Sequence, residues 1–134
     1  MHFFSKNIGR IGEAIAEKYL KKNKYQIIDK NFYLISKITN KKIGEIDLIA
    51  KKNKIYVFVE VKSTTKKNIK IPLEGKINKK KKKRMIIMGE AWLQKNKLPF
   101  TVPWQIDIIT IVINLNDKKA QIKHYRNAIE DIKK

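Results

Sequence analysis

The chain has 134 residues, no cysteine and a formal net charge of +20, from 32 Lys and Arg against 12 Asp and Glu. This length predicts a single domain, 1–134, and the lack of cysteine excludes disulfide scaffolds, cysteine zinc sites and cysteine nucleophiles. No apolar run is long enough to span a membrane, and the start of the chain has no apolar signal-peptide region. We therefore expect a soluble, cytoplasmic protein that does not bind membranes.

Apolar periodicity predicts a first helix over residues 5–23. Ile8, Ile11, Ile15 and Tyr19 recur at helical spacing, and Ser5 precedes them as a candidate N-cap. Runs rich in Ile, Val, Phe and Tyr predict strands at 25–35, 43–50, 55–62, 106–115 and 120–125. A second helix is predicted from residue 77 or 78 to about residue 95, with an apolar stripe of Met85, Ile86, Met88, Gly89, Trp92 and Leu93.

The connections between these elements indicate the architecture. Residues 51–54 are a predicted four-residue hairpin turn, so the strands 43–50 and 55–62 are expected to be neighbours. The strand 55–62 is apolar on both faces, which is typical of a central strand covered on both sides. Residues 64–76 are expected to form a polar loop. The order α-β-β-β-α-β-β predicts an α/β fold, in which helices flank a mixed β-sheet.

Charged residues on the two neighbouring strands form the candidate chemical site. Alternate residues of a strand share a face, so Glu60 is expected beside Lys62, and Glu45 beside Asp47. Because the strands are hairpin neighbours, Asp47, Glu60 and Lys62 are expected to converge. Glu45 either joins this site or only ends its strand, and the sequence leaves both possibilities open.

This grouping suits chemistry on a phosphodiester bond. Ionised groups are costly to bury without partners, and a divalent cation would relieve both carboxylates. Mg²⁺ takes oxygen ligands, often one or two carboxylates with water and phosphate, and the lysine would position or activate a water. The alternative is a structural ion-pair cluster. Glu-x-Lys alone is uninformative, and a second copy at 74–76 is set aside because it falls in the polar loop.

The spacing Asp47-x₁₂-Glu60-x-Lys62 matches the pattern of the PD-(D/E)xK nucleases. The whole chain resembles the YraN-type family of small bacterial proteins. The resembling segments are Gly9-x-x-Gly12-Glu13-x-x-Ala16 with Tyr19-Leu20, Asn31, GEIDLIA (44–50), VFVEVKS (57–63), Trp92-Leu93, Ile106-Asp107 and Asn127-Ala128. This resemblance implies a restriction-endonuclease-like fold, similar to that of archaeal Holliday-junction resolvases. Nuclease activity is implied by the fold and the motif.

The resemblance also implies roles for individual residues. In the resolvase-like relatives a glutamate of the first helix joins the site, and Glu13 matches it. The ligands of one metal ion would be Asp47, Glu60 and the carbonyl of Val61, and Lys62 would act on water. One or two Mg²⁺ or Mn²⁺ ions are expected. A junction resolvase needs two sites on a two-fold axis, so that activity implies a homodimer.

The positive charge favours nucleic acid as the partner, with DNA expected rather than RNA. The expected contacts with its backbone are Lys79, Lys81, Lys82, Lys83, Arg84, Lys66 and Lys67. Lys81 is also the nearest match to a basic or polar residue of the next helix that, in the relatives, often reaches the active site. Two alternatives stay open. The run 79–84 can be a solvated helix face. The high positive charge can also reflect genome composition, because 29 of the 32 cations are lysine, which A/T-rich codons encode.

Several conspicuous residues are assigned to structure. The two tryptophans are expected in the core, and Asp107 is expected to be a buried acid with satisfied hydrogen bonds. His2 and His124 are interpreted as a terminal residue and a strand-end residue, not as metal ligands. Gly12 is expected to permit close packing of helix on sheet, because no strand precedes it as a phosphate-binding loop would require.

These observations support two functions. The leading interpretation is a metal-dependent endonuclease, selective for branched or partly single-stranded DNA if it is structure-selective. The alternative is a non-catalytic nucleic-acid-binding module of the same fold. Glu60→Ala separates them, because the enzyme would lose metal binding whereas the module would keep its salt-sensitive binding of nucleic acid.

Overall fold

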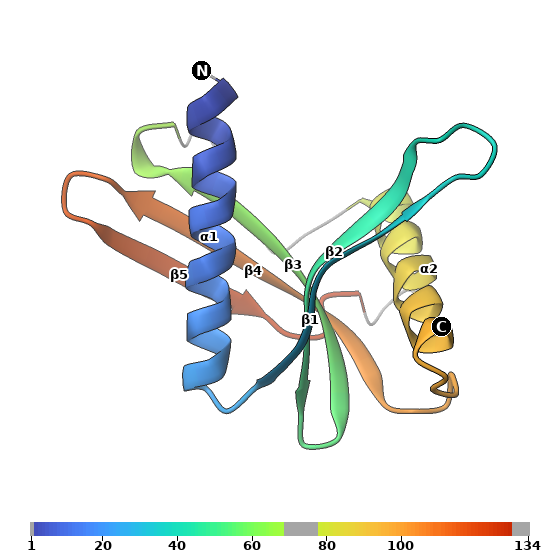
Figure 1. Cartoon of the computed structure of the whole chain (residues 1–134). Coiled ribbons are helices and arrows are strands. Elements are labelled where there is room, and N and C mark those ends of the chain that lie inside the picture. Colours follow the sequence, from blue (N-terminus) through green and yellow to red (C-terminus); the bar gives the residue numbers. More distant parts are fainter. Residues whose placement is uncertain (1, 69–77, 130–134) are drawn as a thin grey trace.

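The computed structural model describes residues 2–68 and 78–129, which form two α-helices and one five-stranded sheet (Figure 1). In chain order the elements are α1 (His2–Lys22), β1 (Gln26–Ile35), β2 (Lys42–Lys52), β3 (Ile55–Thr65), the 3₁₀ turn η1 (Lys66–Asn68), α2 (Lys79–Lys95), β4 (Trp104–Asn114) and β5 (Lys119–Tyr125). This order confirms the predicted α/β fold class and is consistent with a nuclease-like fold. Neither described helix has the length and apolar character that crossing a bilayer requires.

The strands lie in the sheet in their chain order, β1-β2-β3-β4-β5. Three of the four pairings are antiparallel, and β3 and β4 are parallel. Parallel neighbours need a crossover connection, and α2 lies on the connection between β3 and β4. Figure 1 shows α1 on one side of the sheet and α2 on the other. The strand β3 therefore occupies the centre of the sheet.

The sheet separates two apolar cores. Alternate residues of β3 point to opposite faces, so Val57 and Val59 pack in the core beneath α1 with Leu20, whereas Phe58 packs in the core beneath α2 with Trp92. This arrangement confirms that the strand predicted at 55–62 is central and covered on both sides. It also confirms a core position for Trp92, whose side chain is buried.

Two glycines set how closely the helices approach the sheet. A Cβ atom on Gly12 would lie 1.7 Å from the Ser63 hydroxyl oxygen of β3. At Gly44 of β2, a Cβ atom would lie 2.9 Å from the Met88 side chain of α2 and 3.0 Å from that of Arg84. The expectation that Gly12 permits close packing of helix on sheet is thus confirmed. Both contacts lie beside the acidic residues described below.

Several predicted boundaries were wrong by a few residues. Ser5 lies inside α1, which begins at His2, so it is not the N-cap; serine is tolerated within a helix when the backbone ladder continues through it. Asn78 caps α2 by accepting a hydrogen bond from the backbone N–H of Lys81 at 2.8 Å. The predicted four-residue hairpin turn is shorter, because Asn53 and Lys54 adopt left-handed φ angles of 51° and 68° and close the turn alone.

The predicted polar loop at 64–76 was wrong in its first residues. Thr64 and Thr65 extend β3, because they continue its parallel ladder opposite Val112 and Ile113 of β4. The sequence suggested a loop there because threonine is polar, but threonine is also β-branched and suits a strand. The second Glu-x-Lys copy, at 74–76, lies outside the described residues.

Candidate functional site

The candidate site lies where β2 separates from β3. The pairs between these strands run from Lys52 opposite Ile55 to Leu48 opposite Val59. Beyond that point β2 stays paired with β1, while β3 continues along β4 (Figure 1). Asp47 occupies the point of separation, and its Oδ2 accepts a hydrogen bond of 2.7 Å from the backbone N–H of Val61. The Asp47 side chain thus bonds the β3 backbone just beyond the last backbone pair between β2 and β3.

Three carboxylates gather at this separation. Oxygen atoms of Glu13, Glu45 and Asp47 all lie within 4.8 Å of one another. Glu13 reaches the group from α1, and Glu45 and Asp47 reach it from β2. The prediction that Glu45 and Asp47 share a side of their strand is confirmed by this proximity, and the structure places Glu45 in the cluster.

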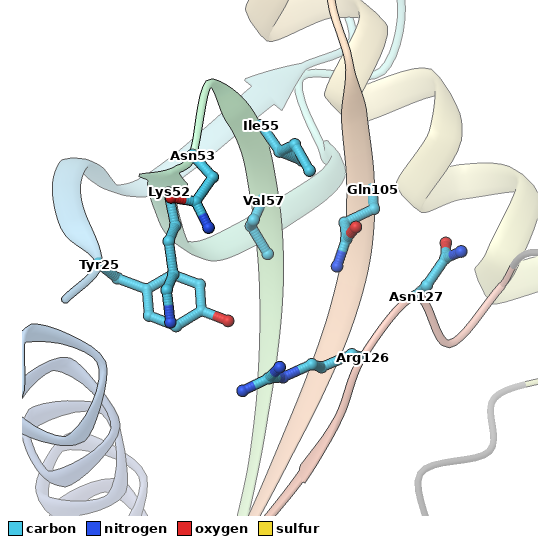
Figure 2. A pocket seen from close by; sticks show the side chains of 8 residues that line it. All are labelled: Tyr25, Lys52, Asn53, Ile55, Val57, Gln105, Arg126 and Asn127. Atoms are coloured by element: carbon cyan, nitrogen blue, oxygen red, sulfur yellow. The ribbon is translucent and has the colours of Figure 1, made fainter. Parts of the chain in front are cut away.

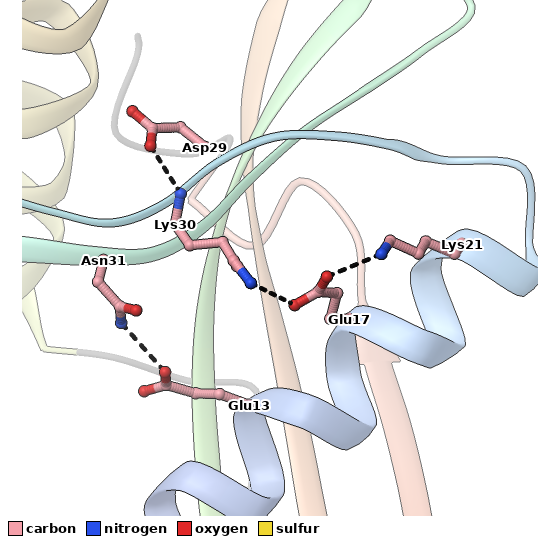
Figure 3. Close-up of polar contacts among 6 residues, drawn as sticks. All are labelled: Glu13, Glu17, Lys21, Asp29, Lys30 and Asn31. Carbon is pink, nitrogen blue, oxygen red and sulfur yellow. Dashed lines mark hydrogen bonds and ion pairs between the residues drawn. The ribbon is translucent and has the colours of Figure 1, made fainter.

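A neighbouring asparagine holds Glu13 in place. The side-chain amide of Asn31, on β1, donates a hydrogen bond of 3.0 Å to Glu13 (Figure 3). Asn31 has a left-handed φ of 52°, a conformation that asparagine tolerates better than most residues. Glu17, one helical turn further on, turns away to Lys21 at 2.9 Å and Lys30 at 3.2 Å. The two glutamates of α1 therefore have different surroundings.

Asp47 is the most perturbed acid of the group. Burial removes water from its carboxylate and is the main reason that its pKa rises to about 7; the hydrogen bond from Val61 opposes the rise. The negative charges of Glu60, Glu13 and Glu45 raise the pKa further. Three carboxylates thus act on Asp47, and a bound cation would relieve this repulsion.

Glu60 and Lys62 lie on β3 next to this group. Glu60 is largely buried, with 9% of its surface exposed, and forms an ion pair with Lys81 of α2. Lys62 is half-buried two residues further along the strand. The structure therefore places Glu60 close enough to act on Asp47 but turns it toward a lysine. It also singles out Lys81 from the basic run as the residue that reaches the acids.

The donor set fits a hard divalent cation. Mg²⁺ binds oxygen at about 2.0–2.1 Å, so ligand oxygens on opposite sides of an ion lie about 4.2 Å apart. The oxygens of Glu13, Glu45 and Asp47 already lie within 4.8 Å of one another, so small movements of their side chains reach that geometry. Carboxylate oxygens without nitrogen or sulfur ligands suit Mg²⁺ or Mn²⁺.

Comparison with known proteins shows the family of this chain. Residues 12–111 match the family described as "Uncharacterised protein family UPF0102". The chain belongs to this family. A UPF0102 protein of Clostridium beijerinckii is 34% identical over 128 residues, covering 96% of this chain and 97% of the relative. One from Aliarcobacter butzleri is 38% identical over 108 residues, covering 81% and 88% of the two chains.

The UPF0102 match contains the three acids of the cluster, and it also contains Glu60, Lys62 and α2. The family resemblance found in the sequence is thereby confirmed over most of the chain. A more distant relative, from Roseiflexus castenholzii, is 27% identical over 124 residues.

The expected nucleic-acid contacts of this UPF0102 chain lie on both sides of the acids. Lys79, Lys83 and Arg84 are exposed on α2, Lys82 is half-buried there, and Lys66 and Lys67 are exposed on η1 directly after β3. Lys81 is the exception, because its charge is directed at Glu60. Cations thus border the separated ends of β2 and β3.

Sequence reasoning missed the partners of two other acids. Asp29 accepts a hydrogen bond of 3.0 Å from the indole N–H of Trp92. Asp107 is fully buried, which confirms its structural assignment, and its Oδ2 lies 2.7 Å from His124 Nε2. His124 in turn bonds Tyr19 at 2.9 Å through Nδ1. Local sequence patterns do not predict these pairs, because His124 lies 17 residues from Asp107 and 105 residues from Tyr19 in the chain.

Proposed function

We propose that this UPF0102 protein is a metal-dependent nuclease that hydrolyses phosphodiester bonds. The observation that carries the proposal is the convergence of Glu13, Glu45 and Asp47, with oxygens within 4.8 Å, beside the basic surfaces of α2 and η1. An acidic cluster among cations suits a substrate that is itself a polyanion and is held by its phosphates.

The residues divide into ligands and helpers. Glu13, Glu45 and Asp47 would hold the first Mg²⁺ or Mn²⁺ ion, and Glu60 with the carbonyl of Val61 would complete the set or hold a second. When bound, the cation stabilises charge on the phosphate and lowers the pKa of a coordinated water. Asp47 has a pKa of about 7 without a cation, so metal binding at neutral pH displaces a proton from it.

Two lysines assist this arrangement. Lys62 would position the attacking water, because it follows Glu60 by two residues on the same strand. Lys81 pairs with Glu60. When Glu60 binds a metal ion instead, the Lys81 ammonium group would be free to pair with a substrate phosphate. This makes the Lys81–Glu60 ion pair the resting form of the site.

The substrate is expected to be DNA, held by its backbone. Lys79, Lys82, Lys83, Arg84, Lys66 and Lys67 supply sequence-independent contacts, so binding should weaken steeply as salt rises. Action on a four-way junction would require two copies of the chain, with their sites related by a two-fold axis.

A cleavage assay tests the proposal. Purified protein is incubated with labelled duplex, single-stranded, flap and four-way-junction DNA and with RNA, in Mg²⁺, Mn²⁺ or EDTA. Wild type should cut at least one substrate only with metal, and Asp47→Asn or Glu60→Ala should lower the rate about 10³-fold. Sedimentation of the protein–junction complex reports whether two copies act together.

The two glutamates of α1 provide a matched control. Glu13→Ala removes a member of the acidic cluster, whereas Glu17→Ala removes an equal charge one turn away that is paired with Lys21 and Lys30. Activity should fall in Glu13→Ala and stay within about twofold of wild type in Glu17→Ala. Equal loss in both would contradict the proposed site.

A non-catalytic nucleic-acid-binding module is the second candidate. It is favoured by the Lys81–Glu60 ion pair, which neutralises the motif glutamate without any metal ion. The module predicts no cutting of any substrate and unchanged, salt-sensitive binding in Glu60→Ala. Metal-dependent cutting that Glu60→Ala abolishes would exclude it.

A further inference from the structure

A pocket lies at the opposite end of the β2–β3 hairpin from the acidic cluster. Its volume is about 310 Å³, at the small end of the range for ligand sites. The polar side chains around it come from Tyr25, Lys52, Asn53, Gln105, Arg126 and Asn127 (Figure 2), and Ile55 and Val57 contribute its apolar wall. Lys52 follows Asp47 by five strand residues, a distance of about 17 Å at about 3.3 Å per residue.

The charge of this pocket is one-sided. Lys52 and Arg126 both line it, and among the described residues no carboxylate does. Lys52 Nζ lies 4.7 Å from the centre of the Tyr25 ring, a contact that directs its charge into the pocket region. Figure 2 shows Arg126 extending toward the same tyrosine. Burial raises the pKa of Tyr25, and the charge of Arg126 opposes this rise.

The wall behind the pocket is held rigidly. The Gln105 amide and the backbone N–H of Asn127 each donate to Asp107 Oδ1 at 2.9 Å. The other oxygen of Asp107 lies 2.7 Å from His124 Nε2, so the buried carboxylate is engaged on both oxygens. Asp107 therefore fixes two residues of the pocket while its own charge faces donors instead of the open space.

We propose that this pocket binds a phosphate group, with Arg126 and Lys52 as its cationic ligands. An arginine fork bonds two phosphate oxygens at once, and a lysine adds a point charge. Two cations match a terminal phosphate, which carries close to two negative charges at neutral pH, better than a carboxylate, which carries one. The amides of Asn53 and Gln105 would contact polar groups next to the phosphate.

The same chemistry has two sources. One is a free nucleotide, and the other is the terminal phosphate of a nucleic acid strand. The second source is geometrically reasonable, because about 17 Å corresponds to about five nucleotides at about 3.4 Å each. A strand end held here would then lie a short, defined length from the acidic cluster.

Binding is tested in EDTA, where no metal-dependent cleavage occurs. The probes are inorganic phosphate, adenosine monophosphate, and a ten-nucleotide single strand with either a 5′-phosphate or a 5′-hydroxyl. Affinities are measured by calorimetry, and NMR signals of the Gln105 and Asn127 side-chain amides locate the ligand. We expect these signals to shift with at least one phosphate-bearing probe.

Two double variants test the cationic ligands, and each removes two positive charges, one pair in the pocket and the other on β5. Lys52→Gln/Arg126→Gln removes both cations of the pocket, and Lys119→Gln/Lys123→Gln removes two exposed cations from β5. The first pair should weaken phosphate binding about tenfold or more, and the second pair about twofold at most. Thermal unfolding of both variants checks that they remain folded.

Each outcome decides the proposal or its source. Tighter binding of the 5′-phosphorylated strand than of the 5′-hydroxyl strand, without binding of adenosine monophosphate, identifies a strand end. Binding of adenosine monophosphate without that difference identifies a free nucleotide. Absence of binding by every phosphate-bearing probe, or equal weakening in both variant pairs, would overturn the proposal. Loss of cleavage by Asp47→Asn leaves it untouched, since the two sites share no residue.

Discussion

Two aspartates of the sheet, the half-buried Asp47 of β2 and the buried Asp107 of β4, have opposite surroundings. Asp107 of β4 is fully buried and has contacts with the Gln105 amide, the Asn127 N–H and His124. Asp47 of β2 accepts a hydrogen bond from the backbone N–H of Val61, and the negative charges of three carboxylates raise its pKa. A carboxylate surrounded by hydrogen-bond donors stabilises the fold. A carboxylate beside other carboxylates is repelled by them, and a bound cation would lower that repulsion.

The largest change in stability is expected when Asp107 is replaced. Asp107→Ala leaves three partly buried groups without their hydrogen-bond partner and should lower the free energy of unfolding by about 3–5 kcal/mol. Urea unfolding measures it. The control is Asp117→Ala, an exposed aspartate that bonds Asn114 and should change stability by less than about 0.5 kcal/mol. A small effect at Asp107 would mean that its contacts stabilise the fold little.

Replacing Asp47 should raise the free energy of unfolding, the opposite of replacing Asp107, and the size of the effect should depend on pH. The pKa of Asp47 is about 7 in the folded chain and 3.8 in the reference state, so the folded state binds more protons between these values. The free energy of unfolding should therefore fall as pH rises from about 4 to about 7, by up to about 1.4 kcal/mol per unit. Asp47→Asn removes this contribution and should be more stable than wild type at pH 8.

The measurement is urea unfolding of both proteins across that pH range in EDTA. The difference between the two proteins isolates the contribution of Asp47 from every group that both proteins share. A difference that stays constant with pH would show that the folded site does not favour the protonated acid.

The packing that carries Glu13 to the site should also be measurable. Gly12→Ala places a methyl group 1.7 Å from the Ser63 hydroxyl oxygen and should destabilise the fold by about 1–3 kcal/mol. In Gly12→Ala/Ser63→Gly the two obstructing Ser63 side-chain atoms are gone, and the Ser63 Cα, at 3.9 Å, is at an ordinary contact distance from the new methyl group. A double-mutant cycle should therefore show favourable coupling between the two changes, and simple additivity would argue against this contact.

The smallest expected effect is stabilisation by metal. Mg²⁺ or Mn²⁺ at ten times its dissociation constant should raise the free energy of unfolding by about 1.4 kcal/mol. Glu13→Ala should reduce this gain and Glu17→Ala should retain it, because only Glu13 belongs to the cluster. Thermal unfolding with and without each metal makes the comparison, and identical gains in both variants would place the metal elsewhere.

Local sequence determined the elements of this protein and their order. Helical spacing in α1 and the β-branched run of β3 are properties of adjacent residues, so both could be predicted without tertiary contacts. The hairpin also made Asp47 and Glu60 neighbours, since a short turn fixes which strands pair. The ends of the elements depended on tertiary contacts, because Thr64 and Thr65 join β3 through their pairing with β4.

Only the tertiary structure decided which charges meet. The sequence left the role of Glu45 open and offered six consecutive basic residues, whereas the fold placed Glu45 beside Glu13 and paired Lys81 with Glu60. It also joined His124 to Asp107 and Tyr19 across three elements. Contacts between distant segments depend on how closely helices and strands pack, and here that distance was set by the absence of a side chain at Gly12 and Gly44.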